Sequence, residues 1–132
     1  MRIYGIGTDV VNINRINKSL KSKNFINRLF NKDEIKKCNG QLNKANCYAK
    51  RFAAKEAFSK AIGTGISRGI NFDEIIVYNI KSGKPGIKLL GNTKKIVNKI
   101  LNKKKINIFL SLSDDKPFAV ATVVISIWQK TV

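Results

Sequence analysis

Two acidic residues, Asp9 and Glu56, stand apart from the other acids of a strongly basic chain. The 132 residues include 26 lysines and arginines, eight acids and no histidine, so the formal net charge is +18. The other six acids form adjacent pairs in predicted turns or strand starts, namely Asp33-Glu34, Asp73-Glu74 and Asp114-Asp115. Asp9 and Glu56 each lie singly within a predicted regular element, with glycine nearby. Their isolation indicates that each carboxylate has a specific partner.

A divalent cation suits both carboxylates. Asp9 follows two glycines in an otherwise apolar segment, where an ionised carboxylate without a partner costs several kcal/mol. Magnesium is commonly held by one or two carboxylates together with water and phosphate oxygens. Lys60, one helical turn after Glu56, and the Gly63-Thr64-Gly65 segment supply charge and close backbone approach to the same phosphates. The residue types therefore predict a magnesium site that faces phosphate groups.

A surface ion pair is the simpler interpretation of Glu56. Glu56 and Lys60 form an (i, i+4) pair in the favourable order, which is worth about 0.2 to 0.5 kcal/mol. A helical wheel places small apolar residues on the face opposite Glu56, so core packing does not explain this acid. The face of Glu56 comprises Phe52, Glu56, Ser59 and Gly63, with Lys55 and Lys60 at its margins. Both interpretations are open at this point.

A strand at the N-terminus and a long central helix must position these residues. Residues 2–13 are rich in β-branched and apolar side chains and predict the strand, whose glycines indicate close approach of another group. Residues 46–62 are rich in alanine and lysine and predict the helix. Asn43 or Asn46 is its expected N-cap, and Gly63 is its expected end.

Shorter elements complete the predicted fold. Helical segments are expected at residues 15–20 after a capping Asn14, at about 25–30, at 33–38 and at 92–104. Strands are expected at 72–80 and 86–90 around a KSGKPG turn, and at 106–113 and 118–128 around a DDKP turn. The order of elements predicts one α+β domain over residues 1–132, with a mainly antiparallel sheet packed on the long central helix.

The location of the protein is predicted from what the sequence lacks. No apolar run reaches the roughly 18 to 20 residues needed to cross a bilayer, and the N-terminus lacks a signal-peptide pattern. A cytoplasmic protein with no membrane partner is therefore expected. Cys38 and Cys47 are the only cysteines, and without histidine they complete no zinc site. We expect both to be free thiols in a reducing compartment.

The charge of +18 favours a polyanionic partner, because such a field attracts negatively charged molecules. Codon bias is the alternative explanation for part of its magnitude, since lysine, asparagine and isoleucine all have AT-rich codons. The main alternative function is a small nucleic-acid-binding protein, which predicts exposed aromatics among basic residues or a groove-reading helix. The aromatics here fall mostly on apolar positions, so a nucleic-acid partner is not expected.

Two blocks of sequence resemble a known family. GIGTDVVNINRI at 5–16 and RFAAKEAFSKAIGTGI at 51–66 are similar to the holo-acyl-carrier-protein synthases, the small bacterial 4'-phosphopantetheinyl transferases. The GKP turn at 83–85 and SLSDDKPFAVATVVI near the end also fit, so the similarity covers nearly the whole chain. The resemblance implies transfer of the phosphopantetheine arm of coenzyme A to a serine of apo acyl carrier protein, with release of adenosine 3',5'-bisphosphate, for fatty acid biosynthesis.

The resemblance also implies roles for individual residues. Asp9 and Glu56 match the magnesium ligands of the family, and Lys60 matches the lysine near the diphosphate. Gly63 and Gly65 would let the chain lie against the nucleotide. Retention of the acidic pair and the lysine argues against a third possibility, an inactive transferase kept as a carrier-protein-binding module.

Other basic residues are expected to contact the substrates. Arg51 and Lys84 are candidates for the 3'-phosphate and adenine end of coenzyme A, although a solvated helix charge and a turn lysine are simpler readings. Acyl carrier protein is acidic and helical, so a basic stripe is expected to meet it. The candidate stripe consists of Arg15, Lys18 and Lys21, extended by Arg28. A merely exposed basic face remains the alternative for each.

The sequence also departs from the family pattern. Some relatives carry a histidine near SDDKP, so the base for the serine hydroxyl must differ here. Water activated by the metal, or a carboxylate such as Asp9 or Glu56 acting through water, is the hypothesis. Many relatives have glutamate where this chain has Asn12, which removes a possible partner of the metal or of Arg15. The small members of the family form trimers with shared active sites, so a homotrimer is expected.

Overall fold

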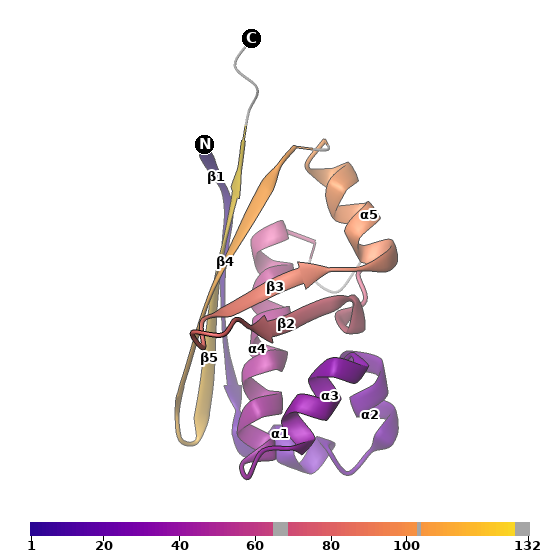
Figure 1. The fold of residues 1–132 in the computed structure, drawn as a ribbon, viewed down its shortest axis with the longest axis vertical. Helices are drawn as coiled ribbons and strands as arrows, with labels where there is room; N and C mark the ends of the chain where they lie inside the picture. Colours follow the sequence, from indigo (N-terminus) through magenta and orange to yellow (C-terminus); the bar gives the residue numbers. More distant parts are fainter. Residues whose placement is uncertain (65–68, 103, 129–132) are drawn as a thin grey trace.

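A three-stranded antiparallel sheet and one long helix lie against each other at the centre of the structure (Figure 1). The computed structural model describes residues 1–64, 69–102 and 104–128. The sheet has the order β1-β5-β4, with β1 at Arg2–Asn12, β4 at Ile106–Asp115 and β5 at Phe118–Ile127. The closing hairpin turns at Lys116 and Pro117, as the DDKP segment predicts.

The long helix α4 spans Lys44–Ile62 and has the ends that the sequence predicts. The Asn43 side chain caps it by accepting a hydrogen bond from the Asn46 backbone N–H, at 3.3 Å. Gly63 ends it with a left-handed φ of 89°, a conformation in which glycine has no Cβ penalty. These local signals explain why the prediction for residues 46–62 is confirmed.

Glycine allows β1 to pack directly on the backbone of α4. A Cβ atom on Gly5 would collide with the carbonyl oxygen of Ala61, and one on Gly7 would collide with that of Ala57. The predicted close approach is therefore confirmed, and the approaching group is the helix itself. Because side chains alternate along a strand, Asp9 points to the same face of β1 as these glycines.

Three short helices gather at one end of α4, as Figure 1 shows. They are α1 at Ile13–Ser19, α2 at Lys23–Leu29 and α3 at Lys32–Asn39. The N-cap of α1 is Asn12 rather than the predicted Asn14, because the Asn12 Oδ1 accepts from the backbone N–H of Asn14 at 2.9 Å and of Arg15 at 3.3 Å. Helix α1 thus begins directly where β1 ends.

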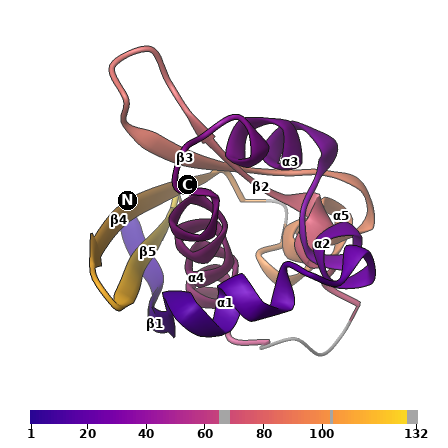
Figure 2. The same ribbon diagram turned by 90° about the horizontal axis from the view of Figure 1, so that it is seen from below.

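A separate antiparallel hairpin forms a second, two-stranded sheet, so the single sheet of the sequence prediction is divided in two. Strand β2 spans Ile75–Asn79 and β3 spans Pro85–Leu89, preceded by a 3-10 turn, η1, at Phe72–Glu74. Helix α5 follows at Gly91–Ile100. Figure 2 shows the turn of this hairpin projecting beyond α3. The α+β class is confirmed.

The prediction of free thiols is wrong, because Cys38 and Cys47 form a disulfide. The short connection between α3 and α4 brings their Cα atoms to 5.4 Å, within the usual range for a disulfide. Both side chains are buried. The argument from free thiols to a reducing compartment therefore no longer holds.

The helical wheel, which places Lys55 at the margin of the face of Glu56, does not predict its burial. Lys55 is fully buried, because α3 and η1 cover this side of α4. Phe52 likewise packs within the chain, with its ring centroid 6.3 Å from that of Phe25 and 6.1 Å from that of Phe72. A wheel drawn for one helix does not show what a distant segment covers.

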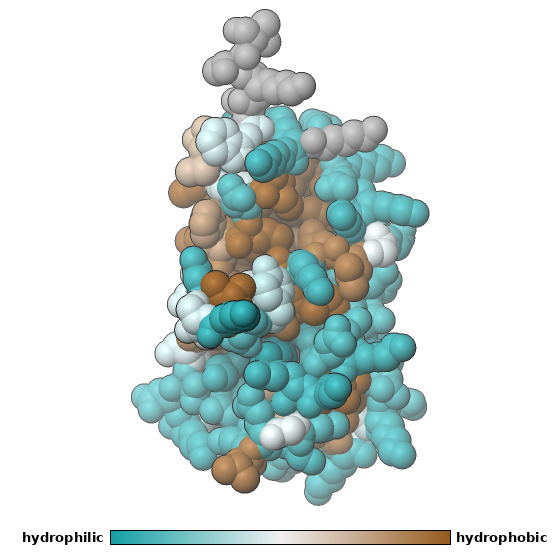
Figure 3. Space-filling view, viewed as in Figure 1, coloured by the Kyte–Doolittle hydropathy of each residue, from teal (hydrophilic) through white to brown (hydrophobic). Residues whose placement is uncertain are grey.

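None of the helices in residues 1–64, 69–102 and 104–128 combines the length and apolar character needed to cross a bilayer. Hydrophilic residues dominate the surface over α1 to α3, whereas hydrophobic residues gather between β4 and α5 (Figure 3).

Candidate active site

The structure brings Asp9, Glu56 and Lys60 together where β1 crosses α4. The Lys60 ammonium donates to Asp9 Oδ1 at 3.1 Å and to the Thr8 carbonyl oxygen at 2.9 Å. The ion pair of Lys60 is thus with Asp9 across the strand and helix boundary, and not with Glu56 as the surface-pair interpretation predicts. The Asp9 side chain is 17% exposed and that of Lys60 is 54% exposed, so the cluster opens to solvent on the lysine side.

The two carboxylates act on each other electrostatically. Partial burial, and then the negative charge of Asp9, raise the pKa of Glu56, while the positive charge of Lys60 opposes this rise. Two carboxylates that repel one another favour a cation between them. The two carboxylates therefore lie close enough to interact, and their role as joint ligands of a cation stays a prediction.

The donor set suits a metal that keeps other ligands. Among the described residues there is no group of three or more His, Cys, Asp or Glu side chains placed to hold a metal. Asp9 and Glu56 would thus be the only carboxylate ligands from this part of the chain. Magnesium fits such a pair, because it retains several waters and takes substrate phosphate oxygens as ligands.

Arg51 is a buried cation with an unmet hydrogen bond. Only 5% of the residue is exposed, and its two outer nitrogens donate to Cys47 Sγ and to Asn79 Oδ1, each at 3.2 Å. Its Nε atom is buried without a partner, and no carboxylate among the described residues pairs with it. Burial lowers the pKa of Arg51, and the negative charge of Glu34 partly opposes this lowering. Arginine binds phosphate well because its planar fork donates several bonds.

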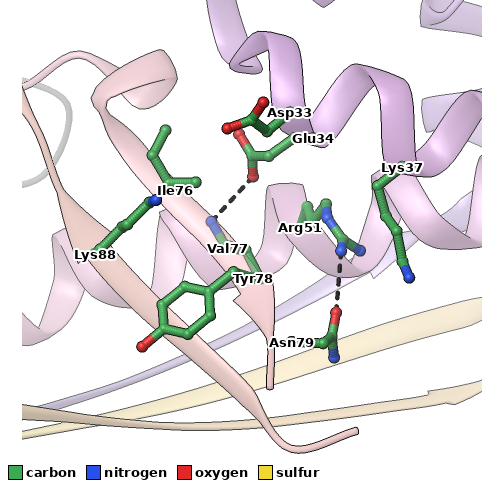
Figure 4. A pocket seen from close by; sticks show the side chains of 9 residues that line it. All are labelled: Asp33, Glu34, Lys37, Arg51, Ile76, Val77, Tyr78, Asn79 and Lys88. Atoms are coloured by element: carbon green, nitrogen blue, oxygen red, sulfur yellow. Dashed lines mark hydrogen bonds between the residues drawn. The ribbon is translucent and has the colours of Figure 1, made fainter. Parts of the chain in front are cut away.

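Arg51 lines two adjoining pockets beside the β2–β3 hairpin. Figure 4 shows the first, in which Arg51 and Asn79 face each other across the space between α4 and β2. The second contains four basic residues and no acid, and the basic residues are Lys37, Lys50, Arg51 and Lys81. This charge distribution favours an anionic ligand. Asn79 and the three lysines were missed by the sequence prediction, because the fold alone brings them to Arg51.

The remaining nucleotide candidates are placed less closely together. Lys84 lies at the hairpin turn and lines a different pocket, between the hairpin and β4, with apolar neighbours such as Ile80 and Ile108. Gly63 ends α4 and is exposed, so its role toward a nucleotide stays a prediction. Gly65 lies outside the described residues.

The acidic cluster and Arg51 lie on different faces of α4. The five residues from Arg51 to Glu56 correspond to about 140° around the helix axis. Neither pocket lined by Arg51 includes Asp9, Glu56 or Lys60.

The candidate carrier-protein stripe is exposed, as predicted. All four residues are on the surface, and they are Arg15, Lys18, Lys21 and Arg28. Lys21 lies just beyond the end of α1, and Arg28 lies in the last turn of α2. Because α1 starts directly after β1, the stripe begins a few residues from Asp9.

Comparison with known proteins gives a consistent result. Residues 5–123 match the family model of the 4'-phosphopantetheinyl transferase superfamily. The holo-[acyl-carrier-protein] synthase of Pelagibacter ubique is 50% identical over 125 residues, covering 95% of this chain and 98% of that protein.

Solved structures agree with this match. The holo-[acyl-carrier-protein] synthase of Neisseria meningitidis is 35% identical with a TM-score of 0.83, covering 94% of this chain and 98% of that one. That of Bacillus anthracis, solved in complex with CoA (3',5'-ADP), is 36% identical with a TM-score of 0.78, covering 95% and 97%. The chain therefore belongs to the 4'-phosphopantetheinyl transferase superfamily.

Proposed function

We propose that this protein transfers the 4'-phosphopantetheine group of coenzyme A to a serine of apo acyl carrier protein, in support of fatty acid biosynthesis. The cluster of Asp9, Glu56 and Lys60 is the observation that carries the proposal, because it unites two repelling carboxylates with a cation at an open site. The names of the relatives support the same activity, as does the coenzyme bound to the Bacillus anthracis protein.

The reaction is a phosphoryl transfer. The serine oxygen attacks the phosphorus that carries the pantetheine arm, the bond from that phosphorus to the bridging diphosphate oxygen breaks, and adenosine 3',5'-bisphosphate leaves. Catalysis of such a step depends mainly on positioning and on neutralising charge. Lys60 has a half-exposed side chain, so its ammonium can turn from the Thr8 carbonyl toward a bound diphosphate.

Asp9 and Glu56 would hold a magnesium ion, as the fit of the donor set supports. When bound, such an ion neutralises diphosphate charge and orients the phosphates. The proton of the serine needs another acceptor than histidine, which the chain lacks. A carboxylate of the cluster, Asp9 or Glu56, acting through water, is our candidate for this acceptor.

Arg51 would bind a phosphate of coenzyme A from the basic pocket, and Lys84 would contact the adenine end from the hairpin turn. The exposed stripe on α1 and α2 would meet the acidic surface of the carrier protein. The cytoplasmic location expected from the sequence stays a prediction.

Association with further copies of the chain, which the resemblance expects to be a trimer, is supported by the outer face of the main sheet. The helices in the described residues lie on the other face, as Figure 2 shows. Ile6, Val124 and Phe109 form a row across the three strands, and Ile6 is 66% and Phe109 49% exposed. Val10, further along β1, is 59% exposed. Apolar side chains in such a row favour burial against another copy. Shared sites would also explain why Arg51 and the acidic cluster face apart.

The direct test mixes purified protein, coenzyme A, magnesium and apo acyl carrier protein, and follows the carrier by mass spectrometry. We expect the added phosphopantetheine mass on the active serine, with adenosine 3',5'-bisphosphate released in equal amount. A carrier protein in which that serine is replaced by alanine is the control. Absence of transfer with an intact fold would refute the proposal.

A further inference from the structure

An ion pair between Glu34 and Lys55 is completely buried between α3 and α4. Both side chains are 0% exposed, and the Lys55 ammonium lies 2.7 Å from Glu34 Oε1. The ammonium also donates to the carbonyl oxygens of Phe72 at 2.7 Å and Ile75 at 2.6 Å. All three of its hydrogens therefore have acceptors, which come from α3, η1 and the start of β2.

The carboxylate of Glu34 is equally engaged. Its Oε1 atom accepts from the backbone N–H of Asn31 at 3.0 Å, which completes the N-terminal cap of α3. Its Oε2 atom accepts from the backbone N–H of Val77, in the middle of β2, at 3.2 Å. One buried pair thus fastens the β2–β3 hairpin to both helices.

Together with the backbone of α4 and β2, these contacts form a closed ring of residues that includes Arg51. Val77 is two residues before Asn79 on β2, and Asn79 accepts a hydrogen bond from Arg51. Arg51 lies one helical turn before Lys55 on α4. Figure 4 shows the two links to β2, from Glu34 to Val77 and from Arg51 to Asn79. The position of β2 relative to α4 therefore sets where the Arg51 guanidinium points.

A buried ion pair contributes little net stability to a core. Replacing such a pair by apolar residues of similar volume is often neutral or stabilising, because both charges lose their hydration on burial. The pair does fix geometry, since hydrogen bonds to charged groups are directional. Arg51 needs such fixing, because its other partner is the weak acceptor Cys47 Sγ.

We propose that Glu34 and Lys55 are positioning residues for substrate binding. Through β2 and Asn79 they hold the Arg51 guanidinium at the basic pocket, so they determine the affinity for the phosphate-bearing nucleotide of coenzyme A rather than the rate of the transfer step. The inference rests on the proposed function, whose chemistry occurs at Asp9 and Glu56 on another face of α4.

The test compares Glu34→Gln with wild type. Glutamine keeps the size of the side chain and one carbonyl acceptor but loses the charge that holds Lys55. We expect the KM for coenzyme A and the dissociation constant of adenosine 3',5'-bisphosphate, measured by calorimetry, to rise about tenfold. The kcat and the KM for the carrier protein should stay within about twofold.

Glu74→Gln is the matched control. Glu74 accepts hydrogen bonds from Asn71 and from the backbone N–H groups of Asn92 and Thr93 at the start of α5, and none from the ring. Glu74→Gln makes the same chemical change as Glu34→Gln and also removes charge-assisted hydrogen bonds. An effect on nucleotide affinity equal to that of Glu34→Gln would mean that general loosening is the cause, and would overturn the inference.

A double variant separates positioning from stability. If Glu34 acts through Arg51, then Glu34→Gln causes no further loss of nucleotide affinity in an Arg51→Ala background. The inference would be overturned if the two substitutions lowered nucleotide affinity independently, or if a folded Glu34→Gln variant kept the wild-type affinity. If Glu34→Gln does not fold, Asn79→Ala removes the hydrogen bond from Arg51 to β2 instead. Unchanged nucleotide affinity in Asn79→Ala would equally overturn the inference. Wild-type protein that neither binds the bisphosphate nor transfers the arm would refute the proposed function and the inference with it.

Discussion

Removing the buried cation of the Glu34 and Lys55 pair should destabilise the fold strongly. Lys55→Met keeps the length of the side chain but deletes one ion pair and two hydrogen bonds to carbonyl oxygens. It leaves the Glu34 carboxylate with two backbone donors and no counter-charge. Breaking a buried pair from one side costs about 3 to 5 kcal/mol.

The lower part of that range is the better expectation. Burial lowers the pKa of Lys55 to about 8, so the charged lysine carries a desolvation penalty that methionine lacks. Glu34, Asp73 and Arg51 surround it, and of these the two acids favour the charged form while Arg51 opposes it. We therefore expect a loss of about 3 kcal/mol in the free energy of unfolding at pH 7, a large share of the roughly 5 to 15 kcal/mol typical of a domain.

Urea denaturation followed by circular dichroism measures this change, at equal protein concentration because oligomers are stabilised by mass action. The double variant Glu34→Leu/Lys55→Met removes both charges and should recover at least half of the loss, because no unpaired charge remains in the core. A single variant that loses less than about 1 kcal/mol would show that the pair is hydrated or weakly coupled, contrary to this reasoning.

Four further results are expected. Asp9→Asn and Glu56→Gln should each reduce turnover at least about a hundredfold with an unchanged circular dichroism spectrum, and near-normal activity in both would disprove the metal assignment. Magnesium should raise the melting temperature of wild-type protein in calorimetry, and an equal rise in Asp9→Asn would place the ion elsewhere. Val10→Lys should convert a trimer to monomers in light scattering, whereas a trimeric variant would mean that the outer sheet face is not the interface. Hydrogen bonding by Asn46, together with the charge of Lys50, lowers the pKa of Asp114. The ionised Asp114 therefore stabilises the fold above the unfolded-state pKa of 3.8, and this stabilisation is lost as pH falls through the folded-state pKa. Acid unfolding of Asp114→Asn that matches that of wild type would contradict this expectation.

The acidic cluster was largely predictable from the sequence. Asp9 and Glu56 are distinguished by their isolation, because the other acids are paired, and Gly5 and Gly7 indicate the close packing between the strand and the helix. Lys60 was assigned to the same group, although its partner in the structure is Asp9 rather than Glu56. The identity of the pair partner depends on which element lies opposite, and helical spacing contains no such information.

Glu34 shows where sequence reasoning stopped. The Asn31-x-x-Glu34 spacing is the pattern of an N-terminal capping box, and that role is present in the structure. Because Glu34 is adjacent to Asp33, the sequence predicts only a pair of acids in a turn or at a strand start. Its contacts with Lys55 and Val77 join residues 21 and 43 positions apart, and no local pattern encodes such a distance.

The sequence alone determined the ends of α4, the order of helices and hairpins, and the isolated carboxylates, because caps, turns and periodicity act within a few residues. Tertiary structure alone decided that Lys55 is buried, that Cys38 and Cys47 meet, and that the hairpin forms its own sheet. These outcomes depend on which faces of separate elements cover one another. That choice is made by burial of the whole chain, in which a lysine is fully enclosed when distant segments bring it a carboxylate and two carbonyl oxygens.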